Sequence, residues 1–135
     1  MLRSESLLKY TLLLVGLAIS LLGLDFAVGG IATLGWQVDP GYVAIADPTA
    51  YQIQDNHIRF LGGLFVVTGL TYVIGSFLIG TMRPALISLS LMIAVAGLFR
   101  LGAMEAALTP SVLPSLLLEL LAFPALALWL WRGAA

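Results

Sequence analysis

Four ionisable residues stand within long apolar stretches of the chain. Arg59 lies in HIRFLGGLFVVTGLTYVIG, Arg100 in ALISLSLMIAVAGLFRLGAM and Glu119 in SLLLELLAFPALALWLW. Asp25 lies late in the first apolar segment. An isolated charge at the centre of a bilayer costs about 2.5–3.5 kcal/mol on insertion scales, so such residues persist where they pair with one another or form a site. These four are the first candidates for chemistry.

Two roles are open to these residues. Two are cationic and two are anionic, so the set can neutralise itself, and pairing of this kind can simply fix how helices pack. Alternatively, Arg59 and Arg100 line a polar pocket that binds an anionic or zwitterionic head group. His57 lies close to Arg59 in the chain and either extends this network or begins a helix at the membrane interface. No residue is assigned a catalytic role, and Glu119 is the candidate for one.

The composition predicts an integral membrane protein. Of the 135 residues, 61% are hydrophobic and 10% are charged, whereas soluble domains have about 25% charged residues. This length holds a single domain of about four spans of ~20 residues each. The net charge of −1 gives no nucleic-acid footprint. Cysteine is absent and histidine occurs once, so we predict no disulfide, no metal site and no cofactor.

The hydrophobic pattern predicts an all-α integral membrane four-helix bundle with a long first outer loop. The N-terminal segment is interpreted as a transmembrane helix rather than a signal peptide. Asp55 is predicted to cap the start of the second helix, and Pro84 is predicted to lie at the start of the third. Pro124 is predicted to kink the fourth helix. The first loop either straps the end of the bundle or forms a lid. The predicted spans are residues 7–30, 56–80, 84–104 and 112–131.

Charged residues near the ends of the spans predict the orientation. In the four-span arrangement, one side carries the basic residues Arg3, Lys9, Arg83 and Arg132, and the other carries the acidic residues Asp39, Asp47, Asp55 and Glu105. Basic residues favour the cytoplasmic side, so both termini are predicted to be cytoplasmic. At 1.5 Å per helical residue, Asp25 and Arg100 lie roughly 27 and 24 Å from the inner side. The quartet Asp25, Arg59, Arg100 and Glu119 is therefore expected in the outer half of the membrane.

Several short motifs resemble a known family. IRFLGG follows an acidic residue, GLFRLG ends the third apolar stretch, and LLLELLAFPAL carries the glutamate of the fourth. Together they resemble a family of small bacterial four-helix membrane proteins catalogued as a domain of unknown function and broadly similar to DoxX-like proteins. The matching positions are Arg59, Gly62, Gly63, Arg100 and Glu119. The resemblance implies a bacterial inner-membrane protein and assigns no reaction.

These observations leave more than one function open. The leading hypothesis is a membrane protein that acts by binding, either as an accessory subunit of a membrane complex or as a holder of a lipophilic ligand. Its expected partners are the lipid bilayer, another membrane protein or a second copy of the chain, and a lipid-like ligand. The alternative is a membrane enzyme or redox helper that acts on a lipid or quinone-like substrate through Glu119, Arg59 and Arg100. A transporter ranks last, because one copy has only about four spans.

Overall fold

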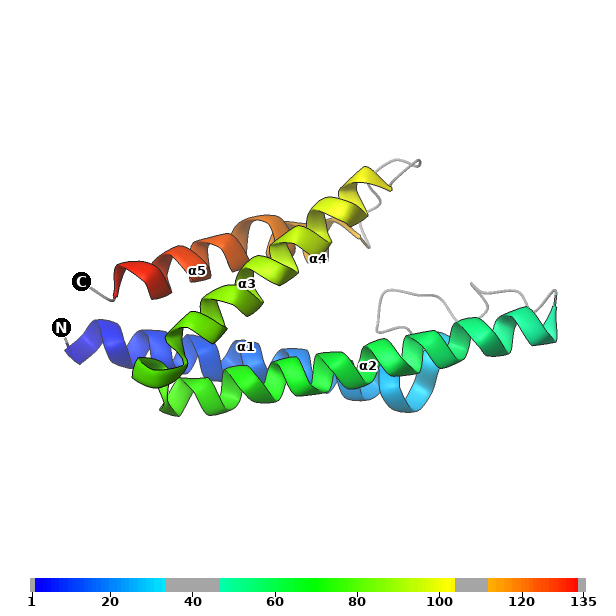
Figure 1. Cartoon of the computed structure of the whole chain (residues 1–135), viewed down its shortest axis with the longest axis horizontal. Helices are drawn as coiled ribbons and strands as arrows, with labels where there is room; N and C mark the ends of the chain where they lie inside the picture. The colour runs from blue at the N-terminus through cyan, green and yellow to red at the C-terminus, as the bar shows by residue number, and fades with distance from the viewer. Residues whose placement is uncertain (1, 34–46, 104–111, 134–135) are drawn as a thin grey trace. The chain divides into compact units, whose positions relative to one another are not determined.

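A computed structural model of the chain describes residues 2–33, 47–103 and 112–133 (Figure 1). This described part is all-helical and contains no strand. Its elements are α1 (Leu2–Gly29), the 3₁₀ turn η1 (Gly30–Ala32), α2 (Pro48–Phe77), α3 (Ile79–Gly102), α4 (Leu113–Leu117), the π-helical turn η3 (Leu118–Ala122) and α5 (Phe123–Arg132). The last three form one continuous helix.

Within the described residues, four helices are long and apolar enough to cross a membrane, as the sequence predicts. They are Glu5–Ala32, Pro48–Phe77, Ile79–Gly102 and Leu113–Arg132. The predicted strap or lid falls largely on residues 34–46, which lie outside the described residues. Asp39 and Glu105 lie outside them as well.

The second span begins earlier than predicted, because Asp47 rather than Asp55 caps it. The Asp47 Oδ1 atom accepts hydrogen bonds from the backbone N–H groups of Thr49 (2.8 Å) and Ala50 (3.3 Å). Pro48 occupies the first helical position, where a proline's missing N–H is not needed. Asp55 lies within the helix. The predicted cap at Asp55 is therefore wrong, and its carboxylate is free to act elsewhere.

The chain divides into two compact units, Met1–Phe77 and Leu78–Ala135. The boundary residue Leu78 has φ −122° and ψ 36°, outside the helical region, and its carbonyl accepts from the N–H groups of Thr81 (3.1 Å) and Met82 (2.9 Å). α3 therefore starts ahead of Pro84, which lies inside the helix. The predicted start at Pro84 is therefore wrong: the helix begins at Ile79, and Pro84 is tolerated inside it although it has no N–H to donate to the carbonyl four residues earlier.

In the first unit, glycines place the backbones of α1 and α2 in direct contact. A Cβ atom on Gly16 would lie 2.7 Å from the Gly69 carbonyl oxygen, and one on Gly69 would lie 2.6 Å from the Gly16 oxygen. Two helical turns further along α1, a Cβ on Gly23 would lie 2.7 Å from the Phe65 Cβ and 2.8 Å from the Gly62 carbonyl oxygen. Small residues at such spacing let two membrane helices approach closely.

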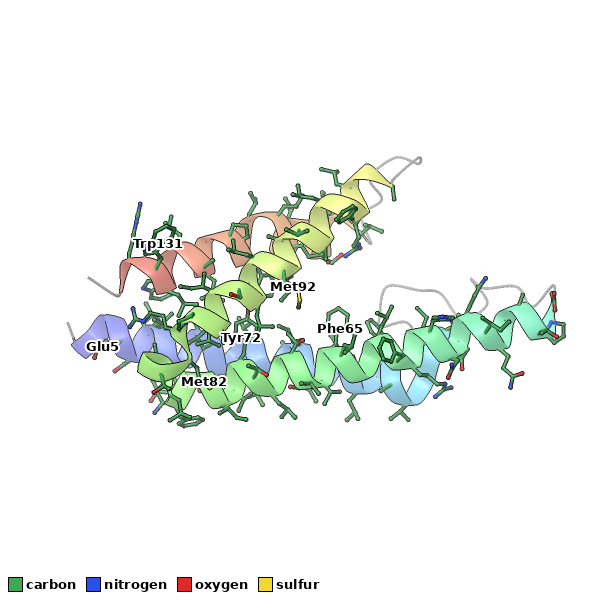
Figure 2. All side chains as sticks on the ribbon, in the orientation of Figure 1. Glu5, Phe65, Tyr72, Met82, Met92 and Trp131 are labelled. Atoms are coloured by element: carbon green, nitrogen blue, oxygen red, sulfur yellow. The ribbon has the colours of Figure 1, made fainter. Side chains whose placement is uncertain are left out.

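The same antiparallel register repeats along the whole pair of helices. Gly16 faces Gly69 and Gly23 faces Gly62, a seven-residue step on both helices that keeps one seam in contact. Figure 1 shows α1 and α2 side by side over much of their length. The rings of Phe26 and Phe65 pack edge to face, with 6.1 Å between their centroids; Phe65 is labelled in Figure 2. At the other end, the Lys9 ammonium lies 4.7 Å from the centre of the Phe77 ring, within range of a cation–π interaction.

The second unit pairs α3 with the helix formed by α4, η3 and α5 (Figure 1). Near the start of α3, the Arg83 Nη1 atom donates to the Leu130 carbonyl in the last turn of α5 (3.0 Å). A cation at a helix C-terminus satisfies carbonyls that have no intrahelical donor. The two helices are therefore antiparallel, and Arg83 fastens one end of the pair.

We predict opposite effects for two neighbouring glycines on α2. A Cβ on Gly62 would lie 2.7 Å from the Phe26 carbonyl carbon and 2.8 Å from the Ala27 Cα, whereas one on Gly63 would meet nothing within 4 Å. Gly62→Ala should lower the free energy of unfolding by about 1–3 kcal/mol through overpacking. Gly63→Ala should leave it unchanged or raise it by up to ~1 kcal/mol through helix propensity. Denaturant titration in detergent, followed by circular dichroism, measures both; equal effects would contradict the register.

Candidate functional site

Arg59 binds the C-terminal end of α1 from its place on α2. Its Nε atom donates to Asp55 Oδ2 at 2.7 Å, one helical turn away. Its Nη1 atom donates to the carbonyl oxygens of Ala27 (3.3 Å) and Val28. The last carbonyls of a helix lack intrahelical donors, and a cation there also interacts favourably with the helix dipole. Arg59 thus serves as a cap for a helix other than its own.

Asp55 binds the 3₁₀ turn η1 that follows α1, and together with Arg59 it forms what we call the Asp55–Arg59 clamp. Its Oδ1 atom accepts a hydrogen bond from the Ile31 N–H at 2.8 Å, so both carboxylate oxygens have partners. Gly30 has φ +61°, a conformation that glycine adopts most readily, and a Cβ there would overlap the Asp55 carboxylate. Asp55 and Arg59 together satisfy donors and acceptors at the end of α1. Their hydrogen bonds give this cluster a structural role.

His57 and Asp25 lie near the same end of the first unit. His57 is exposed, and its Nδ1 atom lies 2.7 Å from the Ile53 carbonyl oxygen one turn earlier in α2. Asp25 lies on α1 and is half-buried, and its backbone carbonyl accepts from the Thr33 hydroxyl at 3.1 Å.

The second unit holds a different cluster between α3 and the last helix. Arg100 Nη1 donates to Glu119 Oε1 in an ion pair. Arg100 Nη2 donates to the Ser115 hydroxyl oxygen at 3.2 Å, and that hydroxyl donates to the Val112 carbonyl at 2.9 Å. Ser115 and Glu119 are one turn apart, so they project from the same side of their helix. Arg100 therefore donates hydrogen bonds to two successive turns of the neighbouring helix.

Gly97 makes the approach of Glu119 possible. A Cβ on Gly97 would lie 2.7 Å from the Glu119 Cβ and 3.2 Å from Glu119 Oε2. Gly97 is one turn before Arg100 on α3, and it is buried. The glutamate side chain therefore lies against bare backbone, with the guanidinium beside it.

Glu119 lies in the π-helical turn η3, which widens the helix by one residue. The Phe123 N–H bonds to the Leu118 carbonyl, five residues back rather than four. Pro124 follows and has no N–H to continue either ladder, and its ring is incompatible with a closely placed carbonyl four residues earlier. The sequence predicts a distortion at Pro124, and the structure has a π turn directly before it. Turns of this type occur often at functional sites.

The Glu119 carboxylate is only half satisfied. Oε1 accepts from Arg100, whereas Oε2 is buried and has no hydrogen-bond partner among the described residues. The side chain of Glu119 is 17% exposed and that of Arg100 is 40% exposed. A buried acceptor without a donor costs about 1–3 kcal/mol, more when it is charged. The cluster of Arg100, Ser115 and Glu119, hereafter the Arg100 site, can therefore accept a further hydrogen bond.

The structure brings some of the predicted site residues together. Arg100 and Glu119 are in contact, and Arg59 pairs with Asp55. Convergence of all four members of the predicted quartet stays a prediction. Sequence reasoning missed Asp55 as a partner of Arg59, although the four-residue spacing indicates a helical ion pair. It also missed Gly97 and Ser115. No group of three or more His, Asp or Glu residues that could hold a metal occurs in the described part of the chain.

Four long apolar helices and paired charges within them define this chain as a multi-pass membrane protein. Its particular family follows from a family model that matches residues 7–130. The chain belongs to the family described as Domain of unknown function (DUF4345), in agreement with the resemblance drawn from its motifs. The broader similarity to DoxX-like proteins stays a prediction. Neither the curated proteins nor the solved structures gave a match.

We predict that removing the Asp55 carboxylate loosens the turn after α1. Asp55→Ala leaves the Ile31 N–H without its acceptor and Arg59 without its ion pair, so the free energy of unfolding should fall by about 1–3 kcal/mol. Hydrogen exchange at the Ile31 amide, followed by NMR, should become faster. Asp47→Ala is the matched control, because it should speed exchange at Thr49 and Ala50 only. An unchanged exchange rate of the Ile31 amide in Asp55→Ala would contradict its hydrogen bond to the Asp55 carboxylate.

We further predict strong non-additivity between Arg100 and Glu119. Arg100→Gln leaves the Glu119 charge unpaired, and Glu119→Gln leaves Arg100 unpaired, so each single change should destabilise the protein by about 1–3 kcal/mol. The double variant has two neutral amides, which can bond to each other, and should lose less than the sum of the two. Unfolding titrations of the four proteins in one detergent measure the cycle. Additive losses would show that the pair does not form.

Proposed function

We propose that this protein is a bacterial inner-membrane protein that acts by binding, as the holder of a lipid-like ligand at the Arg100 site. The ligand is an amphiphile whose polar head meets Arg100 and Glu119 while its apolar part lies among the helices or in the surrounding lipid. Membership of a family without an assigned reaction is compatible with this role, and it does not by itself favour it.

One observation carries the proposal: the buried Oε2 atom of Glu119 lacks a donor among the described residues. Native structures pair the large majority of their buried polar atoms, so an exception calls for an explanation. A ligand with an O–H or N–H group would supply the missing bond. Arg100 has five N–H donors in all, and its bonds to Glu119 and Ser115 leave others for the same ligand.

The surroundings of the site favour an amphiphile over a small polar solute. Arg100 is flanked in the chain by Phe99 and Leu101, and Glu119 by Leu118, all of them exposed apolar residues. In a membrane such surfaces face lipid or another apolar partner. A molecule that reaches Arg100 through this environment must therefore be largely apolar itself.

The same contacts favour binding over catalysis. Within the described part of Leu78–Ala135, Glu119 is the only carboxylate, and no histidine, tyrosine or lysine accompanies it. Many acid–base enzymes use a pair of titratable groups whose environments give one the role of acid and the other the role of base. An enzyme or redox helper that uses Glu119 remains the alternative, and the experiment below separates the two.

The arrangement of charges within each unit supports the predicted orientation. In the first unit, Lys9 lies beside Phe77 at the end of α2; in the second, Arg83 lies beside Leu130, next to Arg132. Leu78 alone separates α2 from α3, which supports placing these basic residues on one side of the membrane. Basic residues favour the cytoplasmic side. We therefore propose that both termini are cytoplasmic.

The test is lipid retention by the full-length protein. Protein stripped of lipid is mixed in detergent with a total bacterial polar lipid extract and examined by native mass spectrometry. We expect one lipid-sized mass to be retained, and we expect Glu119→Gln and Arg100→Gln to reduce its occupancy at least about fivefold, as loss of a charged hydrogen bond predicts. Glu5→Gln, the same change at an exposed position on α1 (Figure 2), should leave the occupancy unchanged.

Four outcomes would overturn the proposal. A protein that retains no lipid under any detergent condition is not a lipid holder. A lipid that is retained equally by all three variants binds elsewhere. A lipid that is recovered with a mass different from the one added has been chemically changed, which would favour the enzyme. Recovery of a co-purifying membrane protein without any lipid would favour an accessory subunit. Circular dichroism of each variant confirms that it is folded.

A further inference from the structure

We infer that the head group held at the Arg100 site is uncharged and carries a hydroxyl next to an acceptor oxygen, as in a partially acylated glycerol. This inference rests on the proposed function and specifies its ligand. It follows from the charge of the site, from the hydrogen-bonding groups that it leaves open, and from the access to them.

The charge balance of the site argues for a neutral ligand. Arg100 and Glu119 cancel each other, and the described part of the second unit has no other charge near them: Arg83 and Arg132 lie at the opposite end of the helix pair, beside Leu130. An anionic head group would leave a net negative charge in this site and a cationic one a net positive charge. Either is costly in an apolar environment, whereas an uncharged group preserves neutrality.

The open hydrogen-bonding positions specify one donor and one acceptor. Glu119 Oε2 can only accept from a donor. The remaining N–H groups of Arg100 can only donate. Ser115 offers nothing further as a donor, because its hydroxyl proton is directed to the Val112 carbonyl. A hydroxyl that donates to the carboxylate, with an ester or ether oxygen beside it for the guanidinium, matches both positions at once.

Access to the carboxylate is on the side of Arg100. The Arg100 side chain is 40% exposed, whereas Gly97 closes the opposite side at backbone distance. Glu119 Oε2 is buried against Gly97, so a ligand reaches this oxygen only when the carboxylate turns about its soft terminal torsion toward the exposed guanidinium. Glu119 lies in the π turn in which the Phe123 N–H bonds to the Leu118 carbonyl, and Pro124, the next residue, has no N–H to donate.

Three lipids with the same acyl chains test the inference on the unmodified protein. The probes are 1,2-dioleoylglycerol, its 3-O-methyl ether, which keeps the acceptors and lacks the donor, and dioleoyl phosphatidic acid, which adds negative charge. Full-length protein in detergent is titrated with each probe and the bound fraction is read by native mass spectrometry. We expect dioleoylglycerol to bind at least about tenfold more tightly than the methyl ether, because the ether lacks a bond to a charged acceptor. Phosphatidic acid should bind no more tightly than dioleoylglycerol.

The variants assign this selectivity to Glu119. In Glu119→Gln the amide can donate to an ether oxygen as well as accept from a hydroxyl, so the alcohol and the ether should bind within about twofold of each other. Ser115→Ala keeps the ion pair and should keep the preference for the alcohol. Glu5→Gln should behave as the unmodified protein. Since the comparison of probes uses the unmodified protein, a variant that fails to fold does not weaken the test.

The possible failures are distinguishable. If phosphatidic acid binds most tightly, or if the ether and the alcohol bind alike, the site holds lipid but not an uncharged hydroxyl head, and only this inference fails. If none of the three probes binds and the total lipid extract leaves no retained mass either, the proposed function fails with it. If the preference for the alcohol persists in Glu119→Gln, the hydroxyl is recognised by another group and the inference is wrong.

Discussion

Every charge that lies among apolar helices must find a partner, and this requirement organises both halves of the chain. An unpaired arginine or carboxylate in a membrane is far more costly than a paired one. Each unit pairs one such arginine with a carboxylate: Arg59 with Asp55 in the first, and Arg100 with Glu119 in the second. In both, close approach of bare backbone makes the pairing possible. Gly30 leaves room for the Asp55 carboxylate, and Gly97 leaves room for Glu119.

The two ion pairs nevertheless differ in how completely their carboxylate oxygens are hydrogen-bonded. The Asp55–Arg59 pair uses both carboxylate oxygens, and Arg59 also donates to two carbonyls at the end of α1. These bonds hold the glycine-lined register of α1 and α2 at its end. The Arg100–Glu119 pair leaves one buried oxygen without a donor among the described residues and lies on a π turn. In the first pair both carboxylate oxygens have partners, whereas in the second one carboxylate oxygen can accept a further hydrogen bond.

The sequence predicts the existence of the four helices well, because long apolar segments have few other structures open to them in a membrane. It predicts their ends poorly. The polar segment QIQDN suggests a loop, yet α2 passes through it from Pro48, since Asp47 supplies the cap. The break before α3 falls at Leu78, where no glycine or proline marks it. The estimated depth of each residue in the membrane places Arg100 and Glu119 at a similar level, and the structure has them in contact. The roles of Gly97 and Ser115 depend on helix packing, which spacing within one helix does not specify.

The most direct measurement of the central claim is the NMR signal of the Glu119 side chain. Protein labelled with ¹³C at the glutamate carboxyl carbon has three such signals, from Glu5, Glu105 and Glu119, and Glu119→Gln identifies the third by its loss. Titration with dioleoylglycerol in micelles should shift the Glu119 signal saturably, leave that of Glu5 unchanged, and produce no comparable shift with the methyl ether. A Glu119 signal that ignores dioleoylglycerol, while the lipid still binds the protein, would contradict the account.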